Sequence, residues 1–214
     1  MDASEVAVLV LAAGAGSRFS AATTLDEAPS KLLATLDGQP ILQHVLDRAA
    51  ELRAAATVVV LGRGPAADSI EATIAWGQAR RVRNSHSERG LATSLRVGLA
   101  ELARPEPAPH GAVLILLGDQ PRVRPAVMQR LLDAADESPE RLIIAPRYAG
   151  GGGSNPVLVR RPGWPLAAAI QGDRGFGPLL SARPDLVHFV EVSGANPDVD
   201  TPGDLADLDE LTRA

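Results

Sequence analysis

The sequence predicts an α/β domain in which helices cover both faces of a mostly parallel central sheet. Apolar, β-branched runs alternate with amphipathic helical patterns along the chain, which is the order typical of layered α/β proteins. Two runs, Val6–Ala12 and His110–Leu117, lack polar alternation, as expected of central parallel strands that are covered on both faces. We detect no internal repeat, so we expect one domain over residues 1–214.

Each expected strand is a short apolar run, and each expected helix carries apolar residues at helical spacing, as in the stripe Leu42, Val45, Leu46 and Ala49. The expected strands are Val6–Ala12, Thr57–Leu61, His110–Leu117, Leu142–Ala145 and Val187–Val192, with PVLV at 156–159 as an apparent further strand. The expected helices are Ile41–Ala55, Pro65–Ala75, Leu91–Ala103, Pro125–Asp136 and Pro202–Thr212.

The composition narrows the possible classes of protein. A net charge of −5 argues against a surface that coats nucleic acid, which is normally basic. The absence of cysteine excludes disulfides, thiolate metal sites and a cysteine nucleophile, and the four scattered histidines suggest no zinc motif. No apolar run approaches the roughly 20 residues of a membrane span. Asp2 and Glu5 precede the first apolar run, where a secretory signal would be positively charged, so we expect a cytoplasmic protein.

The first informative motif is LVLAAGAGSRF, a glycine-rich turn after a strand, whose backbone amides can converge on phosphate oxygens. A dinucleotide fingerprint fits Gly14 and Gly16, but its last position falls on Phe19 and no helix follows at once. A P-loop would need Gly-Lys-Ser/Thr, which is missing. What remains is a loop that brings backbone amides, Arg18 and Lys31 near one anionic ligand, which suits a nucleoside triphosphate. The alternative is an ordinary turn with two solvated cations.

The second motif, AVLILLGDQP, delivers Asp119 to the carboxyl end of a central strand, where ligands bind in open α/β sheets. An aspartate can also simply start a turn, here ahead of Pro121. Beside a loop that carries Arg18 and Lys31, however, a carboxylate can hold Mg²⁺ against phosphate oxygens. We therefore favour a functional role for Asp119.

The third motif, PDVDTPGDL, has a structural explanation for part of its sequence. Thr201 is a good N-cap, Pro202 suits the first helical position, and Asp204 completes a capping box. Asp198 and Asp200 are left unexplained, and one of them could be a second metal ligand.

Three further segments gain meaning mainly from their order along the chain. The four glycines of Tyr148–Asn155 run into PVLV, which favours a mobile binding loop over a linker between domains. The segment ERGLATSL starts a helix near Leu91, where Gly90, Thr93 and Ser94 could act as caps alone. In IQGDRGFGPLL, an aspartate lies between glycines and could belong to a turn.

Taken together, the order LAAGAGSRF, SKLL, GQPIL, GLATSL, LLGDQP, GSNPVL, GDRGFGPLL and DVDTPGDL resembles the MobA-like nucleotidyltransferases over nearly the whole chain. The resemblance is greatest to the branch that transfers CMP from CTP to the molybdenum cofactor, the molybdenum cofactor cytidylyltransferases (MocA-like). It implies a single Rossmann-like domain of the nucleotide-diphospho-sugar transferase (GT-A-like) type, with Mg²⁺ as cofactor.

On the nucleotide side, the resemblance implies that the turn binds the nucleotide through its backbone, that Arg18 and Lys31 bind its phosphates, and that two residues of ERGLATSL lie near its base and ribose. The chain departs from the family between Arg18 and Lys31, where SAATTLDEAPS is longer than the usual loop. The nucleotide-binding residues implied are Leu11, Ala12, Ala13, Gly14, Gly16, Arg18, Lys31, Gly90 and Ser94.

For the metal and the acceptor, the resemblance implies that Asp119 and Asp200 share the Mg²⁺ ion. Asn155, Pro156 and Asp173 match the acceptor side. Arg18, Lys31 and Asp119 would be the catalytic set, in a reaction in which a terminal phosphate of the acceptor attacks the α-phosphorus of the nucleotide and pyrophosphate leaves.

The expected partners are an NTP, with CTP favoured, and a phosphorylated small molecule, with a molybdoenzyme or its chaperone as a further partner of a monomeric enzyme. Nucleic acid and membrane are not expected. Three alternatives stay open: a GTP donor, another phosphorylated acceptor such as phospholactate, and a nucleotide-binding protein of the same fold that has lost turnover.

Overall fold

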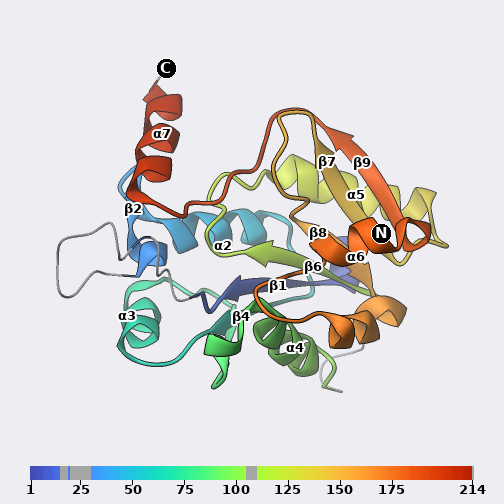
Figure 1. Cartoon of the computed structure of the whole chain (residues 1–214), viewed down its shortest axis with the longest axis horizontal. Helices are drawn as coiled ribbons and strands as arrows, with labels where there is room; N and C mark the ends of the chain where they lie inside the picture. The colour runs from blue at the N-terminus through green and yellow to red at the C-terminus, as the bar shows by residue number, and fades with distance from the viewer. Residues whose placement is uncertain (15–18, 20–29, 105–109, 214) are drawn as a thin grey trace.

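The computed structural model describes residues 1–14, 19, 30–104 and 110–213, and in these residues seven strands form one sheet (Figure 1). Its order is β5-β4-β1-β6-β8-β7-β9, and only β8 runs antiparallel to its neighbours, β6 and β7. The prediction of a mostly parallel sheet is therefore confirmed. The strands are β1 Val6–Ala12, β4 Ala56–Leu61, β5 Arg80–Arg83, β6 Ala112–Leu117, β7 Ile143–Tyr148, β8 Val157–Arg160 and β9 Val187–Val192.

Helices cover both faces of the sheet because the buried strands present apolar side chains on both sides. In β1, Val8 and Val10 pack in the cluster that includes α2 and α5, whereas Leu9 packs in the opposite cluster with α4. Figure 1 shows α2 and α4 on opposite sides of β1. The helices are α2 Ile41–Glu51, α3 Pro65–Thr73, α4 Leu91–Leu102, α5 Pro125–Glu137, α6 Gly177–Ala182 and α7 Pro202–Arg213. Among the described residues, no helix combines the length and apolar character needed to cross a membrane.

The observed helices and strands differ from the predicted ones mainly in their end residues and in segments that contain no apolar run. Helix α2 stops at Glu51 instead of Ala55, because Arg53 adopts a left-handed φ of 54° that a helix cannot continue through. Strand β5 has the sequence RRVR and was not expected, since an edge strand needs no apolar run. The short α6, the hairpin β2 Thr35–Leu36 with β3 Gln39–Pro40, and the 3₁₀ segment η4 Arg161–Ala169 were also not predicted.

The chain places two strand ends side by side at one edge of the sheet. Strands β1 and β6 are parallel neighbours, and the Gly118 amide just after β6 donates to the carbonyl of Leu11 at 2.9 Å. Since β4 and β6 flank β1 on opposite sides, the strand order reverses here, which is where open α/β sheets bind ligands. Ala13 and Gly14, which follow β1, and Asp119, which follows β6, thus leave the sheet next to one another.

The glycine segment Tyr148–Asn155 joins two strands of the same sheet. It connects β7 to β8, and its Gly150 amide donates to Gly194 at 2.9 Å. This connection supports a loop over a linker between domains. The expected mobility of the loop stays a prediction.

Candidate active site

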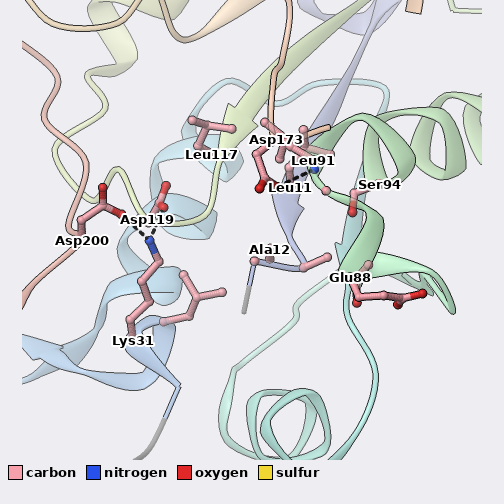
Figure 2. Close-up of a pocket in the computed structure, with 15 residues that line it drawn as sticks. Leu11, Ala12, Lys31, Glu88, Leu91, Ser94, Leu117, Asp119, Asp173 and Asp200 are labelled. Carbon is pink, nitrogen blue, oxygen red and sulfur yellow. Dashed lines mark hydrogen bonds and ion pairs between the residues drawn. The ribbon is translucent and has the colours of Figure 1, made fainter. Parts of the chain in front are cut away.

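A cavity of about 310 Å³ opens at this edge of the sheet, between the end of β1, the first turn of α4 and the end of β6 (Figure 2). It collects ten of the residues that the sequence singled out. Gly16 and Arg18 lie outside the described residues, as does the polar segment 20–29. The predicted residues that line the cavity are Leu11, Ala12, Ala13, Gly14, Lys31, Gly90, Ser94, Asp119, Asp173 and Asp200.

At one side of the cavity, Lys31, Asp119 and Asp200 form an ion triad (Figure 2). The Lys31 ammonium donates to Asp119 Oδ2 at 2.6 Å and to Asp200 Oδ1 at 3.0 Å, and the Lys31 side chain is only 9% exposed. Burial opposes the charged ammonium, but the two carboxylates outweigh that effect and raise the pKa of Lys31. Lys31 therefore reaches the site despite the long segment before it, and it contacts the two predicted metal ligands. Its contact with phosphates stays a prediction.

The donor set of the triad fits a divalent metal ion. Asp119 and Asp200 already direct one oxygen each at a single cation, the Lys31 ammonium. Among the described residues, no group of three or more histidine, aspartate or glutamate side chains is arranged to hold a metal. Mg²⁺ is commonly bound by one or two carboxylates together with substrate phosphates and water. Two protein carboxylates with the remaining ligands supplied by a nucleotide match that pattern.

The segment before α7 is tied to the end of β6 and presents Asp200 to the triad. The Val199 amide donates to the Asp119 carbonyl at 2.9 Å. Asp204 Oδ2 accepts from the amides of Asp200 at 2.9 Å and Thr201 at 2.7 Å, while Thr201 Oγ1 accepts from the Asp204 amide. The predicted capping box is confirmed, and it also fixes the backbone that carries Asp200.

The first turn of α4 is held by the segment that contains Asp173. The Ala92 amide donates to the Gly172 carbonyl at 3.0 Å, and the Leu91 amide donates to Asp173 Oδ1 at 3.3 Å. Asp173 therefore caps a helix that borders the cavity, and its expected contact with an acceptor stays a prediction.

A buried asparagine that the sequence analysis missed supports the same turn from the other side. Asn84 Nδ2 donates to Ser94 Oγ at 2.9 Å, and Asn84 is almost fully buried after β5. It follows a strand that carries no apolar run, so no pattern marked it. The cavity is also lined by five residues that were not predicted as site residues: Leu32, Ser87, Glu88, Leu91 and Leu117.

A second cavity of about 260 Å³ adjoins the first and shares Leu11, Leu91, Leu117 and Asp173 with it. Its wall includes Asn155, one of the predicted acceptor residues. Pro156 is buried beside it and is not among the lining residues. The other side of this cavity is formed by residues 174–178 and Leu180, which are the GDRGFGPLL segment and the start of α6.

Comparison with known families identifies the class of domain. The model of the MobA-like NTP transferase domain matches residues 8–187. The chain belongs to this family. Its resemblance to that family, inferred from the order of short motifs, is therefore confirmed, and the chain is an NTP transferase domain. The match does not distinguish the branch that acts on the molybdenum cofactor.

Solved structures support the same family and fold. Rv0371c from Mycobacterium tuberculosis is 32% identical, with a TM-score of 0.81 over 98% of this chain and 100% of that one. A manganese complex of Rv0371C has a TM-score of 0.76 at 30% identity, over 96% and 98% of the two chains. CMP:2-keto-3-deoxy-manno-octonic acid synthetase complexed with CTP has a TM-score of 0.68 over 97% and 98% of the chains, and its 18% identity shows a common fold alone.

Among curated proteins, the bifunctional protein GlmU of Chromohalobacter salexigens is 36% identical over 130 residues. That alignment covers 61% of this chain and 25% of GlmU. The chain thus spans about a quarter of the length of the curated relatives it matches.

Proposed function

We propose that this protein is a Mg²⁺-dependent nucleotidyltransferase that transfers CMP from CTP to the terminal phosphate of the molybdenum cofactor and releases pyrophosphate. The observation that carries the proposal is the position of the Lys31–Asp119–Asp200 triad beside the backbone turn at the end of β1. This arrangement supports the proposal, because backbone amides that could bind phosphate and carboxylates that could bind a metal ion line one cavity, at the strand ends where α/β domains bind nucleotides.

The charge around the cavity supports a requirement for a divalent ion. Among the described residues that line it, Lys31 is the only cation, whereas Glu88, Asp119, Asp173 and Asp200 are acidic. A free triphosphate would be repelled by these carboxylates. Mg²⁺ held by Asp119 and Asp200 would neutralise phosphate charge and favour departure of pyrophosphate.

The transfer requires the protein to position the two reactants and to stabilise the charge that develops. A phosphate oxygen of the acceptor forms a bond to the α-phosphorus of CTP, and the bond from that phosphorus to the bridging oxygen of pyrophosphate breaks. The acceptor phosphate is already ionised at neutral pH, so no side chain needs to remove a proton. The protein would hold the two reactants in line, with Arg18 and Lys31 stabilising the charge that grows on pyrophosphate.

The second cavity supports an organic acceptor that lies next to the nucleotide. It joins the first cavity at Leu11, Leu91 and Asp173, and its wall includes the apolar side chains of Phe176 and Leu180. An acceptor whose body fills this cavity would reach the first cavity with its phosphate. The family assignment leaves a GTP donor and other phosphorylated acceptors as the competing assignments.

The experiment that tests the proposal measures pyrophosphate release from each NTP with molybdopterin and with a panel of other phosphorylated acceptors, in the presence of Mg²⁺. We expect release with CTP and molybdopterin and formation of the cytidylylated cofactor. Release with GTP, or with another acceptor only, would reassign the substrate. Nucleotide binding without release for any acceptor would indicate a protein that retains the fold but not the reaction.

A further inference from the structure

Two buried amide side chains, Gln120 and Asn196, belong to the two chain segments that carry Asp119 and Asp200. Gln120 is 3% exposed and Asn196 is 4% exposed. Asn196 Nδ2 donates to Gln120 Oε1 at 3.0 Å, and Gln120 Nε2 donates back to the Asn196 carbonyl at 3.3 Å. The two residues thus bind each other reciprocally across 76 positions of the chain.

This amide pair also donates hydrogen bonds to two other residues, Asp198 and Asn155. Gln120 Nε2 donates to Asp198 Oδ1 at 2.6 Å, and Asn196 Nδ2 donates to the Asn155 carbonyl at 3.2 Å. Both amide nitrogens donate hydrogen bonds to oxygen atoms. These contacts determine which way each amide side chain is turned. The pair therefore connects Asp198 to the backbone at Asn155.

The positions of these residues give the network its significance. Gln120 follows Asp119 directly, and Asp198 lies two residues before Asp200. Asn155 is at the end of the glycine loop and lines the second cavity. Burying two amides is costly unless they are hydrogen-bonded. Three of their four side-chain polar atoms are, whereas Asn196 Oδ1 is buried without a hydrogen-bond partner among the described residues. Apolar residues could fill the same space. Without directional hydrogen bonds, however, they would not fix the relative positions of the three segments that carry Gln120, Asn155 and Asn196.

We propose that Gln120 and Asn196 are positioning residues that hold the Asn155 segment in register with the two metal-binding carboxylates. This inference rests on the proposed function, because the purpose of the register is to keep the acceptor phosphate in line with the nucleotide. Neither amide faces the first cavity, so both act through the residues that they hold.

The test compares Gln120→Met with Tyr148→Phe. Methionine has a similar length but removes the links to both Asp198 and Asn196. Tyr148→Phe is the matched control, because the Tyr148 hydroxyl donates to the same Asn155 carbonyl at 3.0 Å without touching the carboxylate side. Asn196→Ser, which removes the amide from the other end, replaces Gln120→Met if the latter does not fold.

Two readouts are measured for each variant. The first is transfer with Mg²⁺, CTP and molybdopterin, where Gln120→Met should lower kcat by about 10- to 100-fold with little change in the KM for CTP. The second is hydrogen exchange at residues 150–157 with and without Mn²⁺ and CTP. In the wild type, we expect the ligands to slow exchange in this segment, and in Gln120→Met that effect should disappear. Tyr148→Phe should keep both properties.

The outcomes separate this inference from the proposed function. If Gln120→Met retains the wild-type kcat and the ligand effect on residues 150–157, the positioning role is wrong. Equal losses in Gln120→Met and Tyr148→Phe would also overturn it, since they would reflect only weaker support of Asn155. If the wild type transfers nothing to molybdopterin, yet Gln120→Met alone loses the effect on exchange, the proposed function fails and the positioning link is supported.

Discussion

At the scale of single residues, the triad shows how the protein accommodates two neighbouring carboxylates in one site. Asp119 and Asp200 would repel one another, and the buried Lys31 ammonium, which contacts them at 2.6 and 3.0 Å, offsets one of their two negative charges. A divalent ion that binds the same oxygens has to compete with this ammonium. We expect Lys31 to turn from the carboxylates to the phosphates as the metal and nucleotide enter, which would reconcile its observed contacts with its predicted role.

The first prediction separates the two carboxylates that we propose to bind the metal, Asp119 and Asp200, from Asp204, which caps the helix. Asp119→Asn keeps the shape of the side chain but removes its charge, so transfer should fall by orders of magnitude while the fold persists. Each factor of ten corresponds to about 1.4 kcal/mol of transition-state stabilisation. Asp200→Asn should behave in the same way. The measurement is the rate of CMP transfer together with the melting temperature of each variant.

Asp204→Asn is the control for this prediction. Asparagine retains an oxygen that can accept from the amides of Asp200 and Thr201, so we expect a loss of about 1 kcal/mol or less in stability and nearly intact turnover. An Asp119→Asn enzyme with a wild-type rate would falsify the metal role.

The second prediction concerns Tyr148, the only tyrosine in the chain. Burial raises its pKa to about 12, against the opposing attraction of the Arg124 guanidinium. Because the folded-state pKa lies above the unfolded value of about 10, the stability from neutral Tyr148 is complete below pH 10 and is lost as the pH rises toward 12. The loss should reach about 2 to 3 kcal/mol. Phenolate absorbance in the native protein should thus appear only near pH 12.

Tyr148→Phe provides the reference for this titration. It should show no phenolate signal, and its stability should lack the tyrosine-dependent decrease between pH 10 and 12. A native titration midpoint close to pH 10 would contradict the burial argument.

At the scale of elements, two glycines at helix N-caps allow a close comparison. Gly64 before α3 has φ 82° and ψ −176°, and Gly90 before α4 has φ 94° and ψ 173°. Both conformations are essentially restricted to glycine. A Cβ at Gly64 would meet no atom within 4 Å, whereas a Cβ at Gly90 would lie 2.4 Å from the Gly172 carbonyl carbon. Of these two glycines, Gly90 alone has another backbone segment, at Gly172, packed closely against it.

The third prediction follows from this difference. Gly64→Ala should lower the free energy of unfolding by about 1 to 3 kcal/mol through backbone strain alone. Gly90→Ala should lose about 1 to 3 kcal/mol more, because the contact with Gly172 has to open. Urea unfolding of both variants measures the difference. Equal losses would mean that the close approach of the two backbones contributes little to the position of α4.

Much of the site could be predicted because strands leave a sequence signal. The apolar runs of β1 and β6 place the glycine turn and Asp119 at strand ends, and parallel pairing brings those ends together. The links among Gln120, Asn155 and Asn196 could not be predicted, since each is a polar residue in a loop and no periodicity records its partner. The pairing of Lys31 with Asp119 was missed for the same reason, as it spans 88 positions.

At the scale of the whole molecule, the negative charge of the protein disfavours the binding of a polyphosphate that carries no metal ion. The chain carries a net charge of −5, and the described lining of the first cavity holds four carboxylates and one lysine. We therefore do not expect long-range attraction to concentrate nucleotides at the site. We expect binding to rely on local groups instead: the backbone amides, Lys31 and a divalent ion.

The last prediction is that CTP stabilises the protein only when a divalent ion is present. A ligand that binds only the folded state adds about 2.7 kcal/mol at 100 times its dissociation constant, which corresponds to a rise of roughly 5 to 10 °C in melting temperature for a protein of this size. Thermal unfolding is measured with CTP and Mg²⁺, with CTP and EDTA, and with Mg²⁺ alone, for the wild type and Asp119→Asn. The rise should occur only for the wild type with both ligands, because Asp119→Asn removes one of the two carboxylates that we propose to bind the ion. An equal rise in EDTA would show that the amides and cations suffice to bind the triphosphate, and the two carboxylates would then need another explanation.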